Sequence, residues 1–418
     1  MKRKITKNLT RILAAVLLSV LVLTAVSCDN GVIPIIDPVT TVSQTENVPP
    51  NSTASDDTSA GPEDTTGKIS ADSSSEPAET SLPSPESGSD PAETYIDPLT
   101  GLRTERDLTY VRPVSLVLDN VSAAAPQSGI SRADILIECM VESGISRLIM
   151  FTNDYGEANE QGGLEVYGPI RSTRHYMVSL SQSVKSLMVG AGYSDQGYGA
   201  IKNGGYDYID GVHDRYALSG FFRDNARIRE KGYEHSLMIT GKGIEKLAAI
   251  YKYPTANSSA TPMAFNFVTE GKEVVLTSGA AYHTILRYSS YQEVQLIYSS
   301  LTGTYYRYQF GDKAHLDAEN GEQLNFKNVF VLFAKQENLE GDTEGRLDVG
   351  VTGGGSGYYI SGGRYALINW SRTGEDKPFE FMTPEGLPLS INRGTTFISV
   401  VSDTLKGTSS IELNYALH

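Results

Sequence analysis

The chain has 418 residues, of which 39% are hydrophobic and 20% are charged, and its formal net charge is −15. This composition excludes a collagen-like fibre, a long coiled coil and a protein with many membrane spans. At roughly 100–200 residues per domain, the length allows two or three domains with sizeable cores. The acidic balance argues against a nucleic-acid partner, because binding to a phosphate backbone needs a basic face.

The first 28 residues predict an export signal of the lipoprotein type. Five basic residues and no acidic residue are followed by the uncharged segment 12–27 and then by Cys28. This segment is shorter than the roughly 20 residues that a spanning helix needs. We therefore expect a signal peptide over 1–27, a lipid on the Cys28 sulfur and a location on the extracytoplasmic face of a bacterial membrane. The alternatives are secretion after a nearby cleavage, or an uncleaved anchor.

Residues 28–94 predict a disordered tether. Residues 29–94 carry a net charge of −12, and the stretch 30–94 has no Phe, Trp or Tyr. A segment rich in Ser, Thr, Pro and acids cannot bury enough apolar surface to offset the entropy lost on ordering. Repulsion between its acidic side chains extends it further.

The folded part is expected to begin near residue 95. Residues 95–418 hold all 24 tyrosines and a net charge of −8. Cys139 is the one cysteine after Cys28, so no disulfide can form within the mature chain. Because Cys139 lies in the apolar run 135–141, we expect it to be a small buried side chain.

We predict a mixed α/β domain over residues 95–255. The branched residues of 114–118 predict a buried strand that ends at Asp119 and Asn120. Helices are expected within 172–185 and 240–251. The glycine-rich segment between them indicates turns around one short helix.

A hairpin is predicted from strands 135–141 and 145–151, with Ser143 and Gly144 as its two-residue turn. The alternative is a helix that begins at a Ser131 cap.

Both alternatives bring two acids and an arginine together. In the hairpin, Glu138 and Glu142 share one face, and Arg147 lies opposite the residue between them. In the helix, the two acids are four residues apart and again lie on one side.

We predict a mainly antiparallel β domain over residues 256–418, which makes the fold class α+β. The sequence alternates or runs apolar in short segments that are separated by turn signals. The expected strands are 264–268, 274–277, 284–288, 294–298, 305–310, 329–333, 347–351, 358–360, 364–370 and 396–401. The glycine run 353–357 is expected to form a bulge or a hairpin turn.

Arg171, Arg174 and His175 stand at the start of a predicted helix. Backbone N–H groups at a helix start, together with guanidinium groups, can bind a carboxylate or a phosphate. The alternative is that the two arginines pair with acids such as Glu138 or Asp119 and stabilise the fold.

A second cluster holds Arg223 and Arg227 near the segment 233–236, which includes His235. Aromatic side chains beside Arg and His suit a pocket for a sugar or a peptide end. The alternative is a capped loop in which His235 bonds to its surroundings.

The sequence shows no zinc-ligand spacing, no calcium-loop spacing and no serine-hydrolase motif. We therefore predict no metal and no cofactor.

Several motifs together resemble the YerB-like bacterial lipoproteins, a family of unknown function. The motifs are Arg112-Pro113-Val114 through Asp119-Asn120, Ala125 to Ser131, Ala133-Asp134-Ile135, Val141 to Arg147, Gly168 to Ser172 and Phe222-Arg223-Asp224. The likeness covers most of residues 97–403. It implies a two-domain body of α and β structure on a lipidated stalk, and it implies no established reaction.

We expect a non-catalytic envelope lipoprotein that binds a polar or anionic component of the cell envelope, such as a cell-wall glycan, or an envelope partner protein. The candidate ligand-binding residues are Asp119, Asn120, Arg147, Arg171, Arg174, Arg223 and Arg227. The alternative is a hydrolase of envelope polymers that uses paired carboxylates and a histidine, for which the candidates are Glu138, Glu142 and His235.

Overall fold

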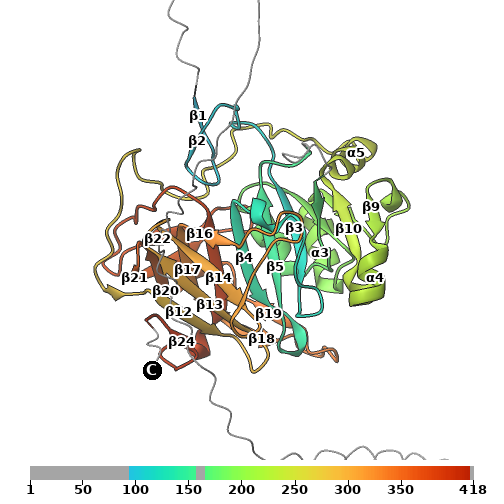
Figure 1. Ribbon diagram of the computed structural model, residues 1–418. Helices are drawn as coiled ribbons and strands as arrows, with labels where there is room; N and C mark the ends of the chain where they lie inside the picture. Colours follow the sequence, from blue (N-terminus) through green and yellow to red (C-terminus); the bar gives the residue numbers. More distant parts are fainter. Residues whose placement is uncertain (1–93, 157–164, 415–418) are drawn as a thin grey trace, which may run out of the picture. The chain divides into compact units, whose positions relative to one another are not determined.

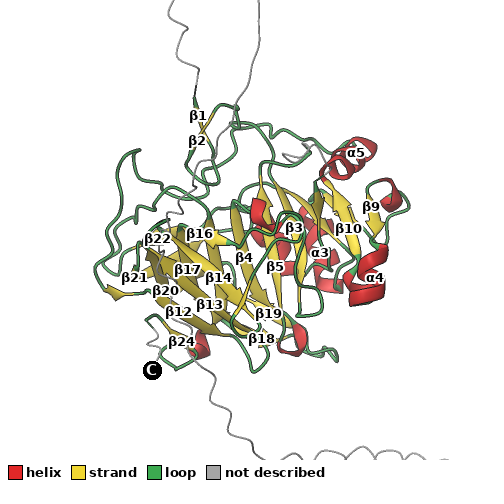
Figure 2. Ribbon diagram, viewed as in Figure 1, coloured by secondary structure: helices red, strands yellow, loops and turns green. Residues whose placement is uncertain are grey.

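The structure is a computed structural model that describes residues 94–156 and 165–414, which belong to one compact unit, Pro85–His418. The predicted signal peptide, Cys28 and the predicted tether up to residue 93 lie outside the described residues. The described residues form a mixed α and β fold in which strands predominate (Figure 2).

The largest sheet has 11 strands and is mixed. Its strands lie in the order β11 (Gly279–Ala280), β21 (Arg364–Arg372), β20 (Gly353–Ser361), β17 (Asn328–Ala334), β23 (Thr396–Ser402), β4 (Ile135–Met140), β5 (Ser146–Thr152), β3 (Val114–Asn120), β7 (Leu187–Gly190) and β8 (Tyr208–Asp210), and β22 (Glu380–Met382) pairs with β21.

Smaller sheets and short helices surround this sheet. An antiparallel six-stranded sheet contains β15 (Lys313–Ala314), β14 (Thr304–Gln309), β13 (Glu293–Ser299), β12 (His283–Arg287), β24 (Ile411–Glu412) and β16 (Asn325–Phe326). A three-stranded sheet contains β6 (Val166–Tyr167), β10 (Leu237–Thr240) and β9 (Phe221–Arg223), and two ribbons pair β1 (Tyr95–Ile96) with β2 (Arg103–Thr104) and β18 (Gln336–Asn338) with β19 (Leu347–Val349). The α-helices are α2 (His175–Gln182), α3 (Asp195–Gly204), α4 (Asn225–Lys231) and α5 (Gly241–Tyr251), and the 3₁₀ turns are η1 (Ile130–Arg132), η2 (Glu142–Gly144), η3 (Ala217–Ser219), η4 (Tyr233–His235) and η5 (Asp403–Leu405).

The 11-stranded sheet joins the two predicted regions. Strand β23 pairs in parallel with β17 on one side and with β4 on the other. In Figure 1 the orange strand β17 and the teal strands β4 and β5 belong to this one sheet, in which β23 lies between β17 and β4. The six-stranded sheet has the antiparallel arrangement expected after residue 255, but the larger sheet is mixed. Strands from both sides of residue 255 share this sheet. The domain boundary near residue 255 therefore stays a prediction.

The central strands β3, β4 and β5 are buried on both faces, which explains their continuous apolar runs. Alternate side chains enter two different cores. The core on one face includes Leu116, Leu118, Leu148, Ile239 of β10 and Leu296 of β13. The core on the opposite face includes Val117, Ile137, Ile149, Met177 and Leu180, the last two from α2.

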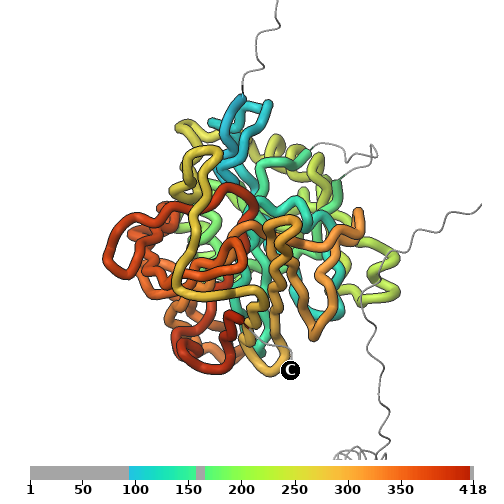
Figure 3. The backbone as a smooth tube through the Cα atoms, turned by 60° about the vertical axis from the view of Figure 1, so that its left-hand side comes forward, coloured from blue at the N-terminus to red at the C-terminus, as the bar shows by residue number. Residues whose placement is uncertain are grey.

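The expected helices are present as α2 and α5, and the Thr240 hydroxyl caps α5 by accepting a hydrogen bond from the Gly243 N–H at 2.9 Å. The strands expected at 264–268 and 274–277 are absent. Figure 3 shows the yellow connection after α5 as a long segment, and it contains no helix or strand before β11. Phe265 is nevertheless buried in the core. A short apolar run indicates burial but does not establish strand pairing.

Strands β4 and β5 form the predicted hairpin, but its register is shifted by one residue. Arg147 pairs with Cys139 rather than with the following residue. The cause is the connection, in which η2 occupies three residues instead of two. A shift of one residue moves every side chain of a strand to the other face. The expectation that Glu138 and Arg147 are neighbours is therefore wrong, because they lie on opposite faces of the sheet.

The glycine run 353–357 lies inside strand β20, so the expected turn or bulge is wrong. The absence of a side chain at Gly355 leaves room for the Trp370 ring. A Cβ on Gly355 would lie 2.5 Å from the Phe333 carbonyl oxygen and 2.8 Å from Nε1 of Trp370. Trp370 Nε1 donates to that carbonyl at 3.2 Å.

A buried ion pair connects the two main sheets. Glu138 of β4 and Arg307 of β14 are both 0% exposed, and Glu138 Oε2 accepts a hydrogen bond from Arg307 Nη2 at 2.7 Å. Glu138 Oε1 accepts further hydrogen bonds from Asn120 (3.0 Å), Ser146 (2.5 Å) and Gln292 (3.0 Å). These additional donors offset the cost of removing the charges from water.

The hydrogen bonds continue from Arg307 back to the end of β3. Arg307 donates to Nδ1 of His315, and Nε2 of His315 lies 2.8 Å from Oε1 of Gln127. Gln127 Nε2 donates to the Asp119 carbonyl oxygen at 2.7 Å. Burial, and then the charge of Arg307, lower the pKa of His315, so the ring is neutral and Nδ1 can accept. We call Glu138, Arg307, His315, Gln127 and Asn120 the Glu138 network.

The substitution Arg307→Met should lower the free energy of unfolding by about 3–5 kcal/mol, because it leaves the Glu138 carboxylate buried without a counter-charge. Urea denaturation of the single variant, of Glu138→Gln and of the double variant measures this effect. The double variant should lose clearly less stability than the sum of the two single losses. Simple additivity would contradict a charge interaction between these two residues.

Candidate functional site

The candidate site lies where three parallel strands end. Strands β3, β7 and β8 are mutually parallel neighbours, so their carboxyl ends meet at one edge of the sheet. Ligands of open α/β sheets commonly bind at such an edge. The segment 168–173 crosses it: the Asp119 N–H donates to the Pro169 carbonyl (2.9 Å), and the Ala191 N–H donates to the Arg171 carbonyl (2.9 Å).

Asp119 holds a histidine and an arginine at this edge. Its side chain is 3% exposed, and Oδ2 lies 2.7 Å from Nδ1 of His235 and 3.3 Å from Nε of Arg171. Glu234 lies beside His235 in η4, and its carboxylate is 3.4 Å from Arg171 Nη2. The sequence therefore predicted a cluster around Arg171 and a cluster around His235 separately, and the structure joins them through Asp119.

A second group of charges adjoins the first. Glu142 pairs with Arg174, whose Nε donates to Oε2 at 3.2 Å, and lies 3.6 Å from Arg147 Nη2. Arg147 Nη1 also donates to the Ser172 carbonyl at 2.5 Å. Burial, and then the charges of Arg174 and Arg171, lower the pKa of Arg147 to about 10. The three arginines are thus close enough to repel one another.

We call Asp119, Glu142, Arg147, Arg171, Arg174 and His235 the arginine site. Three guanidinium groups face two carboxylates there, Asp119 at 3% and Glu142 at 22% exposure, whereas Glu234 is 73% exposed and screened by water. Arg171 has the most exposed guanidinium side chain of the three, at 25%. The site therefore offers a positive group at its rim in an otherwise acidic protein.

The other two candidate arginines, Arg223 and Arg227, donate hydrogen bonds to backbone carbonyls of the protein itself. Arg223 stacks on Tyr233, with 4.0 Å between the guanidinium carbon and the ring centre, and Nη1 donates to the Tyr233 carbonyl at 2.7 Å. Arg227 donates to the carbonyl oxygens of Ala124, Pro126 (3.0 Å) and His235 (2.8 Å). Both arginines hold the loop that carries His235 in place.

Glu138 and Asn120 lie away from the arginine site. They are on the opposite face of the sheet, within the Glu138 network, and Glu138 is fully buried and hydrogen bonded. Glu142 is held by two arginines. The structure therefore does not bring Glu138, Glu142 and His235 together in one cleft.

Sequence reasoning missed a second histidine–carboxylate pair at the same edge. Asp210 ends β8, its Oδ2 lies 2.9 Å from Nδ1 of His213, and its Oδ1 accepts the Gly192 N–H at 2.7 Å. The Tyr193 and His213 ring centres are 4.8 Å apart. The available signal was the short run Tyr208 to Asp210, which forms strand β8 within the glycine-rich segment where the sequence predicts turns.

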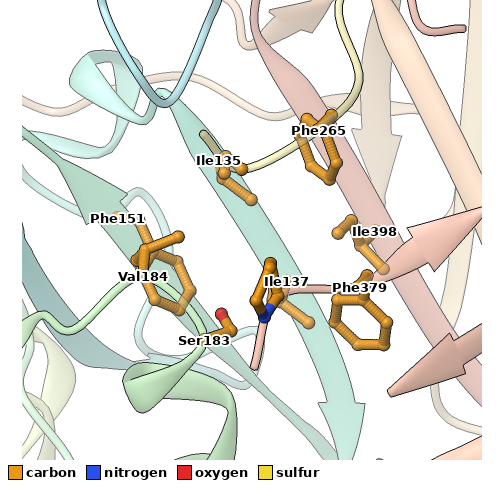
Figure 4. A pocket seen from close by; sticks show the side chains of 10 residues that line it. Ile135, Ile137, Phe151, Ser183, Val184, Phe265, Phe379 and Ile398 are labelled. Carbon is orange, nitrogen blue, oxygen red and sulfur yellow. The ribbon is translucent and has the colours of Figure 1, made fainter. Parts of the chain in front are cut away.

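The apolar cavity in Figure 4 is too small for a ligand. Ile135, Ile137, Phe265 and Ile398 point toward its centre, and its volume is about 10 Å³. That is room for one water molecule at most. This cavity is a packing gap between β4 and the segments that cover it.

A larger cavity of about 370 Å³ lies beside the β1–β2 ribbon and includes Asp134 and Asn153. Burial, and then the charge of Asp97, raise the pKa of Asp134 to about 8. Arg103 and Arg106 also line this cavity. Asp134 is half-buried, and acids with a raised pKa occur both at functional sites and in structural charge networks.

Over residues 94–156 and 165–414, no group of three or more His, Cys, Asp or Glu side chains is arranged to hold a metal ion. In the same residues, no helix has both the length and the apolar character that crossing a membrane requires. Cys139 is fully buried, and burial followed by the Glu138 charge raises the pKa of its thiol, as suits a small core side chain.

Comparisons with known proteins agree with the resemblance seen in the sequence. The family models for the N-terminal and C-terminal domains of "Protein of unknown function (DUF3048)" match residues 99–254 and 283–398. The protein named "Putative lipoprotein YerB" of Bacillus subtilis (strain 168) is 29% identical over 312 residues, which cover 73% of this chain and 86% of YerB. The crystal structure of the YerB protein from Bacillus subtilis matches with a TM-score of 0.61 at 26% identity, covering 73% of this chain and 96% of that one. The predicted resemblance to the YerB-like family is confirmed.

The substitution Glu142→Gln should lower the free energy of unfolding by about 2 kcal/mol at neutral pH, because Arg147 and Arg174 lose the charge that both face. Burial opposes ionisation of Glu142, but the two arginines outweigh it and hold its pKa below the ordinary value of 4.5. A carboxyl group whose pKa is lower in the folded protein than in the unfolded protein stabilises the fold at any pH above the unfolded pKa. This stabilisation is lost as the pH falls through the folded pKa. The difference between wild type and variant, measured by urea denaturation, should therefore shrink below about pH 4.

The control is Glu337→Gln, which removes an exposed carboxylate paired with Lys335 at 2.8 Å. It should change stability by less than about 0.5 kcal/mol. An equally small change in Glu142→Gln would contradict the role given to Glu142.

Proposed function

Because the chain belongs to the DUF3048 family, we propose that it is a lipid-anchored envelope protein that binds an anionic component of the cell envelope at the arginine site. The lipid anchor is Cys28, the tether holds the folded part near the extracytoplasmic face of a bacterial membrane, and the ligand is a cell-wall polymer or an envelope protein with exposed carboxylates or phosphates. The amino-terminal sequence pattern and the similarity to a protein named as a lipoprotein support the anchor.

One observation carries the binding proposal: Arg147, Arg171 and Arg174 lie together at the carboxyl edge of parallel strands, with the carboxylates of Asp119 and Glu142 between them. Guanidinium groups bind carboxylates and phosphates through paired N–H donors. Arg147 and Arg174 are enclosed and supply a positive field, whereas Arg171 is accessible at the rim. Glu234 is the exposed counter-ion that a ligand anion would displace from Arg171.

The test uses the full chain in detergent micelles and sedimentation with purified bacterial cell walls. Arg171→Gln should weaken wall binding by about tenfold, the effect of losing one charge-assisted hydrogen bond. The matched control is Arg103→Gln, which removes an arginine that is 55% exposed and paired with Glu270 at 2.5 Å. Walls stripped of their phosphate-containing polymers distinguish phosphate from carboxylate recognition. Equal binding by wild type and a folded Arg171→Gln variant would refute the site.

The second candidate function is hydrolysis of an envelope polymer, and the Asp119–His235 pair favours it. A carboxylate that holds one ring nitrogen orients the other nitrogen to move a proton. His235→Asn should then abolish the release of soluble fragments from purified walls by the full chain, while His283→Asn, a change in β12, leaves it intact. If wild type releases no fragments, the candidate is excluded and the binding proposal is unaffected.

A further inference from the structure

Another cavity lies where the two sequence regions meet, and no part of the proposed function uses it. We call it the junction pocket: it has a volume of about 270 Å³, and its lining is partly apolar, with Pro126, Phe310 and Leu316, and partly polar, with Lys231, Gln309, Lys313 and His315. A single water needs about 10–15 Å³, so this cavity can hold a ligand of several heavy atoms. It adjoins the Glu138 network through His315.

The charge of the junction pocket is opposite to that of the protein. Lys231 and Lys313 are both at its wall, and no carboxylate is among its lining residues in the part of the chain that the structure describes. The chain as a whole has a net charge of −15. Lys231 Nζ is fixed at the wall because it donates to the Ala125 carbonyl at 3.0 Å. The nearest acids along the chain, Asp312 beside Lys313 and Glu230 beside Lys231, do not line the cavity.

A buried donor without a partner lines the same cavity. Gln309 is 2% exposed, and its Nε2 has no hydrogen-bond partner among the described residues. Its Oε1 accepts from Arg307 Nη1 at 2.8 Å, so the orientation of the amide is set by the Glu138 network. An unpaired buried N–H group costs about 1–3 kcal/mol and calls for an acceptor.

We propose that the junction pocket binds a phosphate group of a small envelope metabolite or lipid headgroup. Two lysines supply point charges, which suit a phosphate group. Because the walls come from both sequence regions, bound phosphate would strengthen their junction.

The test is thermal unfolding of the full chain in detergent with increasing inorganic phosphate, against sodium chloride of equal ionic strength. Phosphate should raise the melting temperature of wild type beyond the effect of chloride. Lys313→Gln should weaken the apparent affinity about tenfold, and Gln309→Glu, which keeps the oxygen that Arg307 needs, should abolish it by repulsion. Lys335→Gln, an exposed control, should respond as wild type does.

Two further arms identify the source of the phosphate. Glycerol 3-phosphate tests a soluble ligand, and vesicles with and without phosphatidylglycerol test a lipid headgroup. An effect of phosphate that matches chloride, or that persists unchanged in both Lys313→Gln and Gln309→Glu, would overturn the proposal. Failure here with intact wall binding would leave the arginine site standing, since Arg171 is not part of the junction pocket.

Discussion

The fold depends on neutralising the charge of Glu138, which is fully buried between the 11-stranded sheet and the six-stranded sheet. A carboxylate in that position is stable only when a cation and further donors surround it. Arg307 supplies the cation from a strand 169 residues further along the chain. The two sequence regions are therefore linked both by shared strands of one sheet and by a charge pair that neither region can satisfy alone. His315 and Gln127 extend this link back to the end of β3.

The same strand end also organises the arginine site. Asp119 and Asn120 are consecutive, so the alternation of a strand directs them to opposite faces. Asn120 joins the Glu138 network on one face, whereas Asp119 holds His235 and Arg171 on the other. A structural polar cluster and a candidate binding site are thus separated by the thickness of one sheet. The junction pocket lies next to the structural cluster, which fixes the amide of its lining residue Gln309.

Much of the fold could be predicted from local patterns. The strand that ends at Asn120, the Thr240 helix cap and most strands after residue 283 follow from apolar runs, capping residues and turn residues. One prediction was wrong because a single residue decided the outcome. A connection of three residues instead of two shifted the β4–β5 register and separated Glu138 from Arg147. Glu138–Arg307 and Asp119–His235 join residues far apart in the chain, and one sequence contains no local signal for such pairs. The arginines were found because basic residues are clustered in an acidic chain, but their partners could not be assigned.

The central claim is that Arg171 is the group at the rim of the arginine site that meets an anionic ligand. The most direct measurement follows the Nε–Hε NMR resonances of the arginine side chains of the full chain while soluble cell-wall fragments are added. The account predicts a saturable shift of the Arg171 resonance, a smaller shift for the enclosed Arg174, and none for the distant, exposed Arg103. Saturable binding that leaves the Arg171 resonance unchanged would contradict it.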